Sequence, residues 1–158
     1  MKTLVLGLGN PILSDDGVGI RVAQEVEKQL GTIRREARQA EVAVTETSGA
    51  GFSLLDSMTG YDRVIIVDAI QTEKGPVGHI YRLAPEDFSF ARHLSSPHQI
   101  NLITALELGK ILNLPMPQKI TIFAVEVEDV TNFSERCTPK VEGAIPEVVK
   151  MVLGELNT

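Results

Sequence analysis

Several residue types are scarce in this sequence, and each scarcity excludes a class of function. The 158 residues include one cysteine, Cys137, so neither an intrachain disulfide nor a thiolate zinc cluster can form. Aromatic residues make up 4% of the chain and tryptophan is absent, which argues against aromatic cages and base-stacking platforms. The 15 basic residues are outnumbered by 21 acidic ones, and the net charge of −6 argues against nucleic acid or an anionic membrane as a partner.

Long apolar runs are missing as well. No segment reaches the roughly 18 apolar residues that a membrane-spanning helix needs. The apolar N-terminal run is broken by glycines, and Asp15 and Asp16 stand where a signal peptide would need small residues for cleavage. We therefore expect a buried first strand in a cytoplasmic protein, and the length predicts a single domain over residues 1–158.

Strand and helix patterns alternate along the chain. Apolar and β-branched runs predict strands at residues 3–8, 41–47, 63–68, 78–83 and 119–127, with the strand at 78–83 at a sheet edge. Helical spacing predicts helices at 16–30, 52–58, 97–113 and from 139 onward, with loops at 34–40 and 84–95. Ser96 and Thr138, each followed by proline, are expected to cap the last two helices, and Leu102, Ile103, Leu106 and Ile111 to face inward. The alternation predicts an α/β fold, with a mostly parallel central sheet of about five strands and helices on both faces.

In such sheets ligands bind beyond the carboxyl ends of the strands. Asp68 directly follows four apolar residues, and a carboxylate in that position needs a partner. Two acids follow the first strand; we expect Asp15 to cap the next helix and Asp16 to face the cleft. Three further acids end the fifth strand: Glu126, Glu128 and Asp129.

Of the three histidines, His98 is the best ligand candidate. It lies in the first turn of a predicted helix, where the helix dipole favours the neutral imidazole that binds metals. If Asp16, Asp68 and His98 converge, they form an oxygen–nitrogen site suited to a divalent first-row metal. We expect His79 and His93 to be incidental.

Other common sites are disfavoured. A dinucleotide-binding turn needs a third glycine where this chain has Ile12, and two acids at the helix start would repel a phosphate. The H-E-x-x-H pattern of zinc proteases and the G-x-S-x-G pattern of serine hydrolases are absent. The helix-start position of Cys137 is compatible with a lowered pKa, but a lone buried cysteine is the favoured interpretation.

Five motifs in order resemble those of the [NiFe]-hydrogenase maturation proteases. They are Leu4-Val5-Leu6-Gly7-Leu8-Gly9-Asn10, Asp15-Asp16-Gly17-Val18-Gly19, Ser48-Gly49-Ala50-Gly51, Ile65-Ile66-Val67-Asp68-Ala69 and Ser96-Pro97-His98-Gln99. The resemblance covers essentially the whole chain. It implies a cytoplasmic endopeptidase with a three-layer α/β fold of the phosphorylase/hydrolase type, which removes the C-terminal extension of a hydrogenase large-subunit precursor after nickel insertion.

The resemblance also implies roles for particular residues. Asp16, Asp68 and His98 correspond to the metal-contacting residues, which recognise nickel carried by the substrate, and they are the expected catalytic residues. Gly9, Asn10, Gly49 and Gly51 correspond to loops at the substrate. The expected partner is the large-subunit precursor, with the enzyme acting as a monomer. Some members of the family have Glu at the position of Asp16, and several end the fifth strand with glycine and proline, so the identity of the client is left open.

Two other functions share features with this sequence. A non-catalytic nickel-handling chaperone would need the same three ligands, and cleavage of a precursor distinguishes the two. The opening Leu6-Gly7-Leu8-Gly9-Asn10-Pro11 also resembles peptidyl-tRNA hydrolases, but their histidine about ten residues later is missing here.

Overall fold

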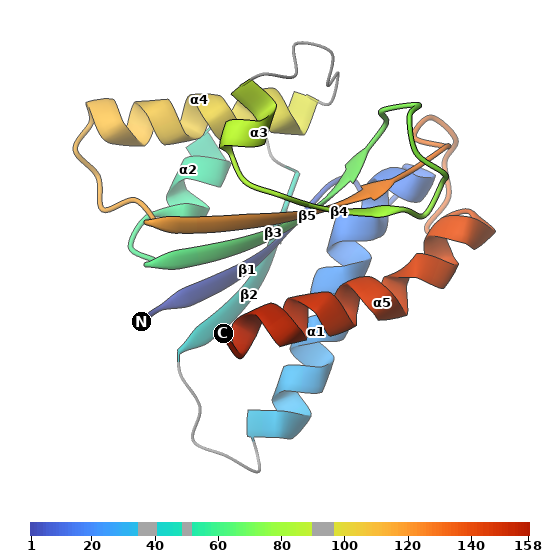
Figure 1. Cartoon of the computed structure of the whole chain (residues 1–158), viewed down its shortest axis with the longest axis horizontal. Coiled ribbons are helices and arrows are strands. Elements are labelled where there is room, and N and C mark those ends of the chain that lie inside the picture. Colours follow the sequence, from blue (N-terminus) through green and yellow to red (C-terminus); the bar gives the residue numbers. More distant parts are fainter. Residues whose placement is uncertain (35–40, 49–51, 90–96) are drawn as a thin grey trace.

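The core of the protein is one five-stranded sheet (Figure 1). The computed structural model describes residues 1–34, 41–48, 52–89 and 97–158. The strands are β1 (Thr3–Leu8), β2 (Val42–Thr47), β3 (Arg63–Ile70), β4 (Ile80–Leu83) and β5 (Lys119–Glu126). Their order is β2-β1-β3-β5-β4, and only β4 runs antiparallel to its neighbour. The predicted mostly parallel sheet, with 78–83 at its edge, is confirmed.

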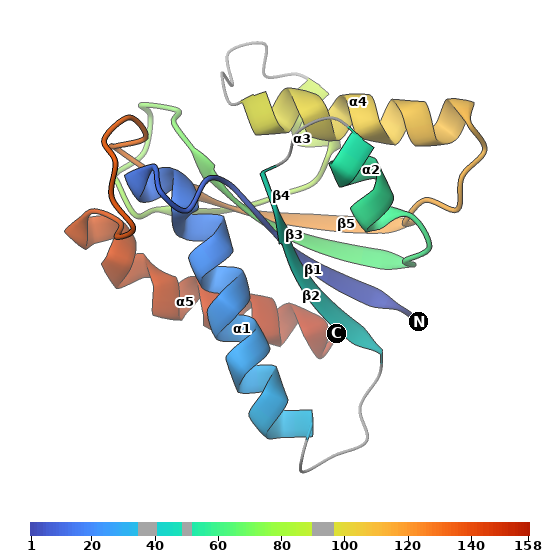
Figure 2. The same ribbon diagram turned by 180° about the vertical axis from the view of Figure 1, so that it is seen from behind.

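Helices cover both faces of the sheet. Figures 1 and 2 show α1 (Val18–Arg34) and α5 (Pro139–Leu156) on one face, and α2 (Phe52–Met58) and α4 (Pro97–Ile111) on the other. A short helix, α3 (Glu86–Ser89), lies next to α4, and a 3₁₀ turn, η1 (Ser14–Gly17), precedes α1. The three-layer α/β prediction is confirmed.

Alternating side chains of the central strands divide the core into two halves. Val5, Ile65 and Val67 pack with the apolar faces of α1 and α5, whereas Leu6 and Ile66 pack with α2 and α4. The strands β1 and β3 are buried along their whole length, as their apolar runs predicted. The helix predicted from residue 139 onward is confirmed as α5, and Val141, Ile145, Val148, Val149 and Val152 on one side of it are all buried in the first half.

Four details of the prediction were wrong. The predicted loop 84–95 contains α3, because Asp87 accepts a hydrogen bond from the backbone of Ala84 at 2.7 Å and closes a first turn. The strand β4 begins at Ile80, so His79 precedes it. The first helix is split into η1 and α1. Ile111, predicted to face inward, is 75% exposed because it lies in the last turn of α4, beyond the sheet.

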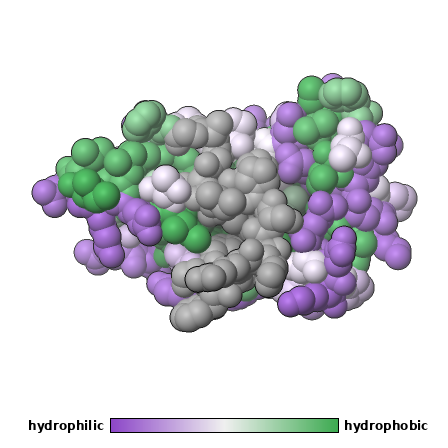
Figure 3. Space-filling model, turned by 90° about the horizontal axis from the view of Figure 1, so that it is seen from above, coloured by the Kyte–Doolittle hydropathy of each residue, from purple (hydrophilic) through white to green (hydrophobic). Residues whose placement is uncertain are grey.

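Two large apolar side chains are exposed at the end of α4, Ile111 at 75% and Leu112 at 54%. Figure 3, seen from above, shows where apolar residues (green) gather on this face of the molecule. Among the described helices, none has the length and apolarity required to cross a bilayer. The predicted cap Ser96 and the predicted loop 34–40, apart from Arg34, lie outside the described residues.

Candidate active site

The turn after β1 places Asp16 at the carboxyl edge of the sheet. Gly9 has a φ of 144°, and a Cβ there would lie 1.9 Å from the backbone oxygen of Asp16. Only glycine therefore lets the chain fold back this closely. The Asp16 carboxylate, half-buried, accepts a 2.9 Å hydrogen bond from the backbone amide of Asn10.

The start of α1 packs directly on the two central strands. A Cβ on Gly19 would lie 2.3 Å from the carbonyl oxygen of Val67 and 2.5 Å from that of Leu8. On the strand side, a Cβ on Gly7 would lie 2.4 Å from the carbonyl oxygen of Gly19. In a dinucleotide-binding fold, the third glycine of the G-x-G-x-x-G motif allows the helix to approach the strand closely. This chain has Ile12 at that position, and Gly7 and Gly19 allow the close approach instead.

Asp68 lies on the neighbouring strand. It is 3% exposed, and β3 continues past it to Ile70, so it stands two residues before the strand end rather than at it. Its Oδ1 accepts a 2.8 Å hydrogen bond from the backbone amide of Ala69. Strand alternation puts Asp68 on the same face as Val64 and Ile66, which is the face that α2 and α4 cover.

The helix that carries His98 points its first turn toward the same end of the molecule. Figure 1 shows α4 beginning at the side where β1, β3 and β5 finish and ending where β5 starts. The structure therefore brings the backbone of His98 to the end of the sheet that holds Asp16 and Asp68. The His98 side chain lies outside the described part, as do Gly49, Gly51 and His93. Among the described side chains, no three His, Cys, Asp or Glu groups lie together as metal ligands, so the three-residue site stays a prediction.

The prediction that Asp15 caps the helix that follows it was wrong. It is 0% exposed, and η1 has no side-chain cap hydrogen bond. Its Oδ1 accepts from the Thr138 amide at 2.6 Å, and its Oδ2 accepts from the amides of Glu128 and Asp129 at 3.2 and 3.1 Å. The Thr138 hydroxyl also donates to this carboxylate, at 2.9 Å from Oδ2. The carboxylate thus binds a loop more than 110 residues away in sequence, because that loop has unpaired backbone donors at the buried position.

The acids that end β5 have structural partners. Glu126 is 2% exposed; it accepts hydrogen bonds from the Thr72 amide at 2.8 Å, from the Tyr81 hydroxyl at 3.0 Å, and from the Thr72 hydroxyl. These contacts hold the segment between β3 and β4 against the sheet. Asp129 binds the side chain and backbone of Asn132 and the backbone of Thr131, and these hydrogen bonds lower its pKa.

Cys137 is buried and hydrogen-bonds weakly to the Ser14 carbonyl, with 3.8 Å between sulfur and oxygen. Burial, together with the negative charges of Asp15 and Glu142, raises the pKa of its thiol to about 11. The interpretation as a lone buried cysteine is confirmed, and a helix-start thiolate is not formed.

An ionic cluster lies at the opposite end of the sheet. Glu155 is 8% exposed and accepts two 3.1 Å hydrogen bonds from Arg82 and one of 3.2 Å from Thr121. Arg63, 1% exposed, and Lys119 lie 3.5 and 3.7 Å from its Oε1. Burial opposes ionisation of Glu155, but the hydrogen bonds from Arg82 and Thr121 and the charges of Arg82 and Lys119 outweigh it and lower its pKa. Because this cluster joins the end of α5 to the starts of β3 and β5, its role is structural.

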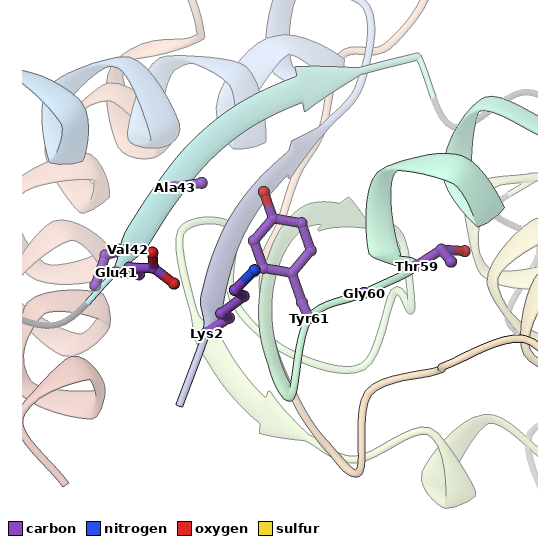
Figure 4. A pocket seen from close by; sticks show the side chains of 7 residues that line it. All are labelled: Lys2, Glu41, Val42, Ala43, Thr59, Gly60 and Tyr61. Atoms are coloured by element: carbon purple, nitrogen blue, oxygen red, sulfur yellow. The ribbon is translucent and has the colours of Figure 1, made fainter.

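A pocket of about 520 Å³ also lies at that opposite end. Figure 4 shows Lys2 and Tyr61 among its lining side chains, with Glu41, Val42 and Ala43 from the start of β2 and its preceding residue. None of the predicted site residues lines it, so its size does not make it the candidate site.

Sequence reasoning expected Asp16 and Asp68 at the carboxyl edge of the sheet, where the structure places them, but missed the bonding role of Asp15 and the Glu126–Thr72–Tyr81 cluster. Local patterns do not identify these bonding partners, since the bonds join residues 45 to 123 positions apart. One signal was available: two adjacent acids at a helix start cannot both cap that helix.

Comparison with known proteins identifies the family of this chain. A family model described as "Hydrogenase maturation protease" matches residues 20–155, which include Asp68 and His98. The hydrogenase 2 maturation protease of Escherichia coli (strain K12) is 31% identical over 158 residues, covering 99% of this chain and 92% of that protein. A hydrogenase expression/formation protein, HupD, of Rhizobium leguminosarum bv. viciae is 23% identical and covers 99% and 75% of the two chains.

Solved structures give the same result. The hydrogenase maturating endopeptidase HybD from Escherichia coli superimposes with a TM-score of 0.82 at 30% identity, covering 99% of this chain and 93% of that one. The [NiFe] hydrogenase maturation protease HybD from Thermococcus kodakarensis has a TM-score of 0.77 at 20% identity, with 99% of both chains covered, and shows the shared fold. The chain therefore belongs to the hydrogenase maturation protease family and is an endopeptidase of that family.

Proposed function

We propose that this protein removes the C-terminal extension of a [NiFe]-hydrogenase large-subunit precursor after nickel has been inserted there. Family membership supports the precursor as substrate. The observation that carries the nickel requirement is the placement of two carboxylates, Asp16 and Asp68, at the carboxyl edge of neighbouring parallel strands, with the first turn of α4 directed to the same edge. The enzyme acts as a cytoplasmic monomer.

The nickel belongs to the substrate in this proposal. Two carboxylate oxygens and the imidazole of His98 supply oxygen and nitrogen ligands with open positions, a donor set that suits a divalent first-row metal. Recognition of nickel already held by the precursor makes cleavage depend on completed metal insertion. The purified enzyme therefore needs no permanently bound metal.

Two routes lead to hydrolysis of the peptide bond. In the first, the substrate's nickel acts as a Lewis acid, polarising the scissile carbonyl or activating a water molecule. In the second, Asp16 or Asp68 removes a proton from the attacking water as general base. Both routes need a carboxylate at position 68. In the Lewis-acid route Asp68 is a ligand of the substrate's nickel, and in the general-base route it is either that ligand or the base.

The test is the intact mass of a candidate large-subunit precursor after incubation with this protein, with and without nickel loading. We expect loss of the C-terminal extension alone, and only from the nickel-loaded form. Asp68→Asn keeps the shape and the oxygen that accepts the Ala69 amide but removes the charge, so cleavage should stop while the fold is kept.

Asp62→Asn is the matched control. Asp62 is an exposed aspartate at the other end of the same strand, where it binds the Lys2 amide at 2.7 Å, and its loss should leave cleavage unchanged. Full activity of Asp68→Asn on a nickel-loaded precursor would refute the site. Binding of the nickel-loaded precursor without any cleavage would instead favour a non-catalytic nickel-handling chaperone.

A further inference from the structure

Asp15 is a fully buried carboxylate next to the candidate site, and it accepts hydrogen bonds from four donors. These donors are the backbone amides of Glu128, Asp129 and Thr138 and the Thr138 hydroxyl. We call Asp15 and these three partner residues the Asp15 clamp. Hydrogen bonds to an ionised carboxylate are stronger than bonds between neutral groups, so a carboxylate with four donors is held firmly.

The clamp joins two segments that also meet through their backbones. The Asp15 amide donates to the Asp129 carbonyl at 2.8 Å, and the Ser14 amide donates to the Ser134 carbonyl at 2.9 Å. In return, the Ser134 amide donates to the Ile12 carbonyl at 3.0 Å. The turn that leads into α1 and the loop that leads into α5 therefore form one rigid unit.

Asp16 is the next residue in the same 3₁₀ turn. Successive residues of such a turn project about 120° apart, so Asp15 can be fully buried while Asp16 stays half-buried at the sheet edge. Any rotation of the turn that moves Asp15 also moves Asp16 and stretches the bond from the Asn10 amide to its Oδ2.

Thr138 shows that the clamp is more than an ordinary helix cap. It occupies the N-cap position of α5 with an extended backbone, yet it makes no side-chain bond to its own helix. A threonine there normally accepts a bond from the second or third amide of the helix. Here the hydroxyl donates to Asp15 instead, so the start of α5 is used to fix the turn that carries Asp16.

From these contacts we infer that Asp15 is a positioning residue of the active site: through the clamp it holds the Asp16 carboxylate in the orientation that contacts the substrate. This inference rests on the proposed function. Asp15 itself is fully buried and touches no substrate.

The test compares three variants in the full chain. Thr138→Val removes one hydroxyl donor and keeps the side-chain shape, Thr138→Ser keeps the hydroxyl, and Asp15→Asn replaces one accepting oxygen with an NH₂ group that faces donors. Thr131→Val is the matched control, because it makes the same chemical change as Thr138→Val at an exposed threonine of the same loop, outside the Asp15 clamp.

Four quantities are measured for each variant: kcat and KM for cleavage of the nickel-loaded precursor, the melting temperature, and the hydrogen-exchange rate of the Asn10 amide. We expect Asp15→Asn and Thr138→Val to lower kcat by about tenfold to a hundredfold with KM within about twofold, since small displacements of a reacting group have effects of this size. The Asn10 amide should exchange faster in both. Thr138→Ser, which keeps the hydroxyl, and the control Thr131→Val should behave like the unmodified chain in kcat and in Asn10 exchange.

The outcomes separate the inference from the proposed function. If the unmodified chain cleaves the precursor but Asp15→Asn and Thr138→Val lose no more activity than Thr131→Val does, the positioning role is overturned and the function stands. If the unmodified chain cleaves no precursor, the proposed function fails, but the exchange rate of the Asn10 amide still tests whether the Asp15 clamp holds Asp16 in place. An unchanged rate in Asp15→Asn overturns this positioning role, and a faster rate supports it.

Discussion

The close approach of α1 to the sheet makes Gly19 the most sensitive glycine of the helix. A Cβ at this position would lie 2.3 Å from the Val67 carbonyl oxygen and 2.5 Å from the Leu8 carbonyl oxygen, far inside van der Waals contact. Both neighbours are backbone atoms of buried strands and cannot rotate away. The change Gly19→Ala therefore forces the start of α1 outward, away from Val67, the residue before Asp68.

The magnitude follows from two opposing effects. Overpacking in a rigid region costs about 1–3 kcal/mol, and occasionally more. Alanine in place of glycine inside a helix recovers about 0.5–1 kcal/mol. Because the contact here is with backbone atoms, we expect the steric cost to exceed the gain in helix preference. The net loss in the free energy of unfolding should be about 1–2 kcal/mol.

Gly31→Ala is the matched control in the same helix. A Cβ at Gly31 would meet nothing within 4 Å, so only the helix preference acts and the protein should become slightly more stable. Urea unfolding of both variants, followed by circular dichroism, measures the difference. A Gly19→Ala protein as stable as Gly31→Ala would refute the steric reasoning.

Three further outcomes can be measured. Glu155→Gln should lower the free energy of unfolding at pH 7 by about 3 kcal/mol, because it leaves the buried Arg63 without its counter-charge. Since the folded-state pKa of Glu155 is lowered, this stabilisation is fully present above the ordinary pKa of 4.5. The difference in stability between the unmodified chain and Glu155→Gln should therefore vanish as the pH falls through the lowered pKa. Cys137, with its pKa raised to about 11, should resist iodoacetamide at pH 8 in the folded protein and react fast in urea; equal rates in the two states would contradict its burial. Gly9→Ala should destabilise the protein and slow precursor cleavage, since its Cβ would collide with the backbone oxygen of Asp16; unchanged kcat would show that the turn tolerates another path.

Local patterns were sufficient for most of the secondary structure. The apolar runs of β1 and β3 reflect burial on two faces, and the helical spacing of the apolar residues of α5 reflects burial on one. The element boundaries were less certain: β3 extends two residues past Asp68, and α3 lies within a segment predicted as loop. Such ends depend on single hydrogen bonds, such as the bond from the Ala84 amide to Asp87, which periodicity does not reveal.

For the candidate site, the sequence by itself determined which residues could carry the chemistry, because acids that follow apolar strands of a parallel sheet must gather at one edge. It also favoured Asp16 over the adjacent Asp15 as the residue that faces the cleft, but it assigned Asp15 to a helix cap. Only the tertiary structure decided that Asp15 is instead buried against Thr138 and the loop after β5. The physical reason is that a buried backbone amide needs an acceptor, and the folding of distant segments decides which acceptor reaches it.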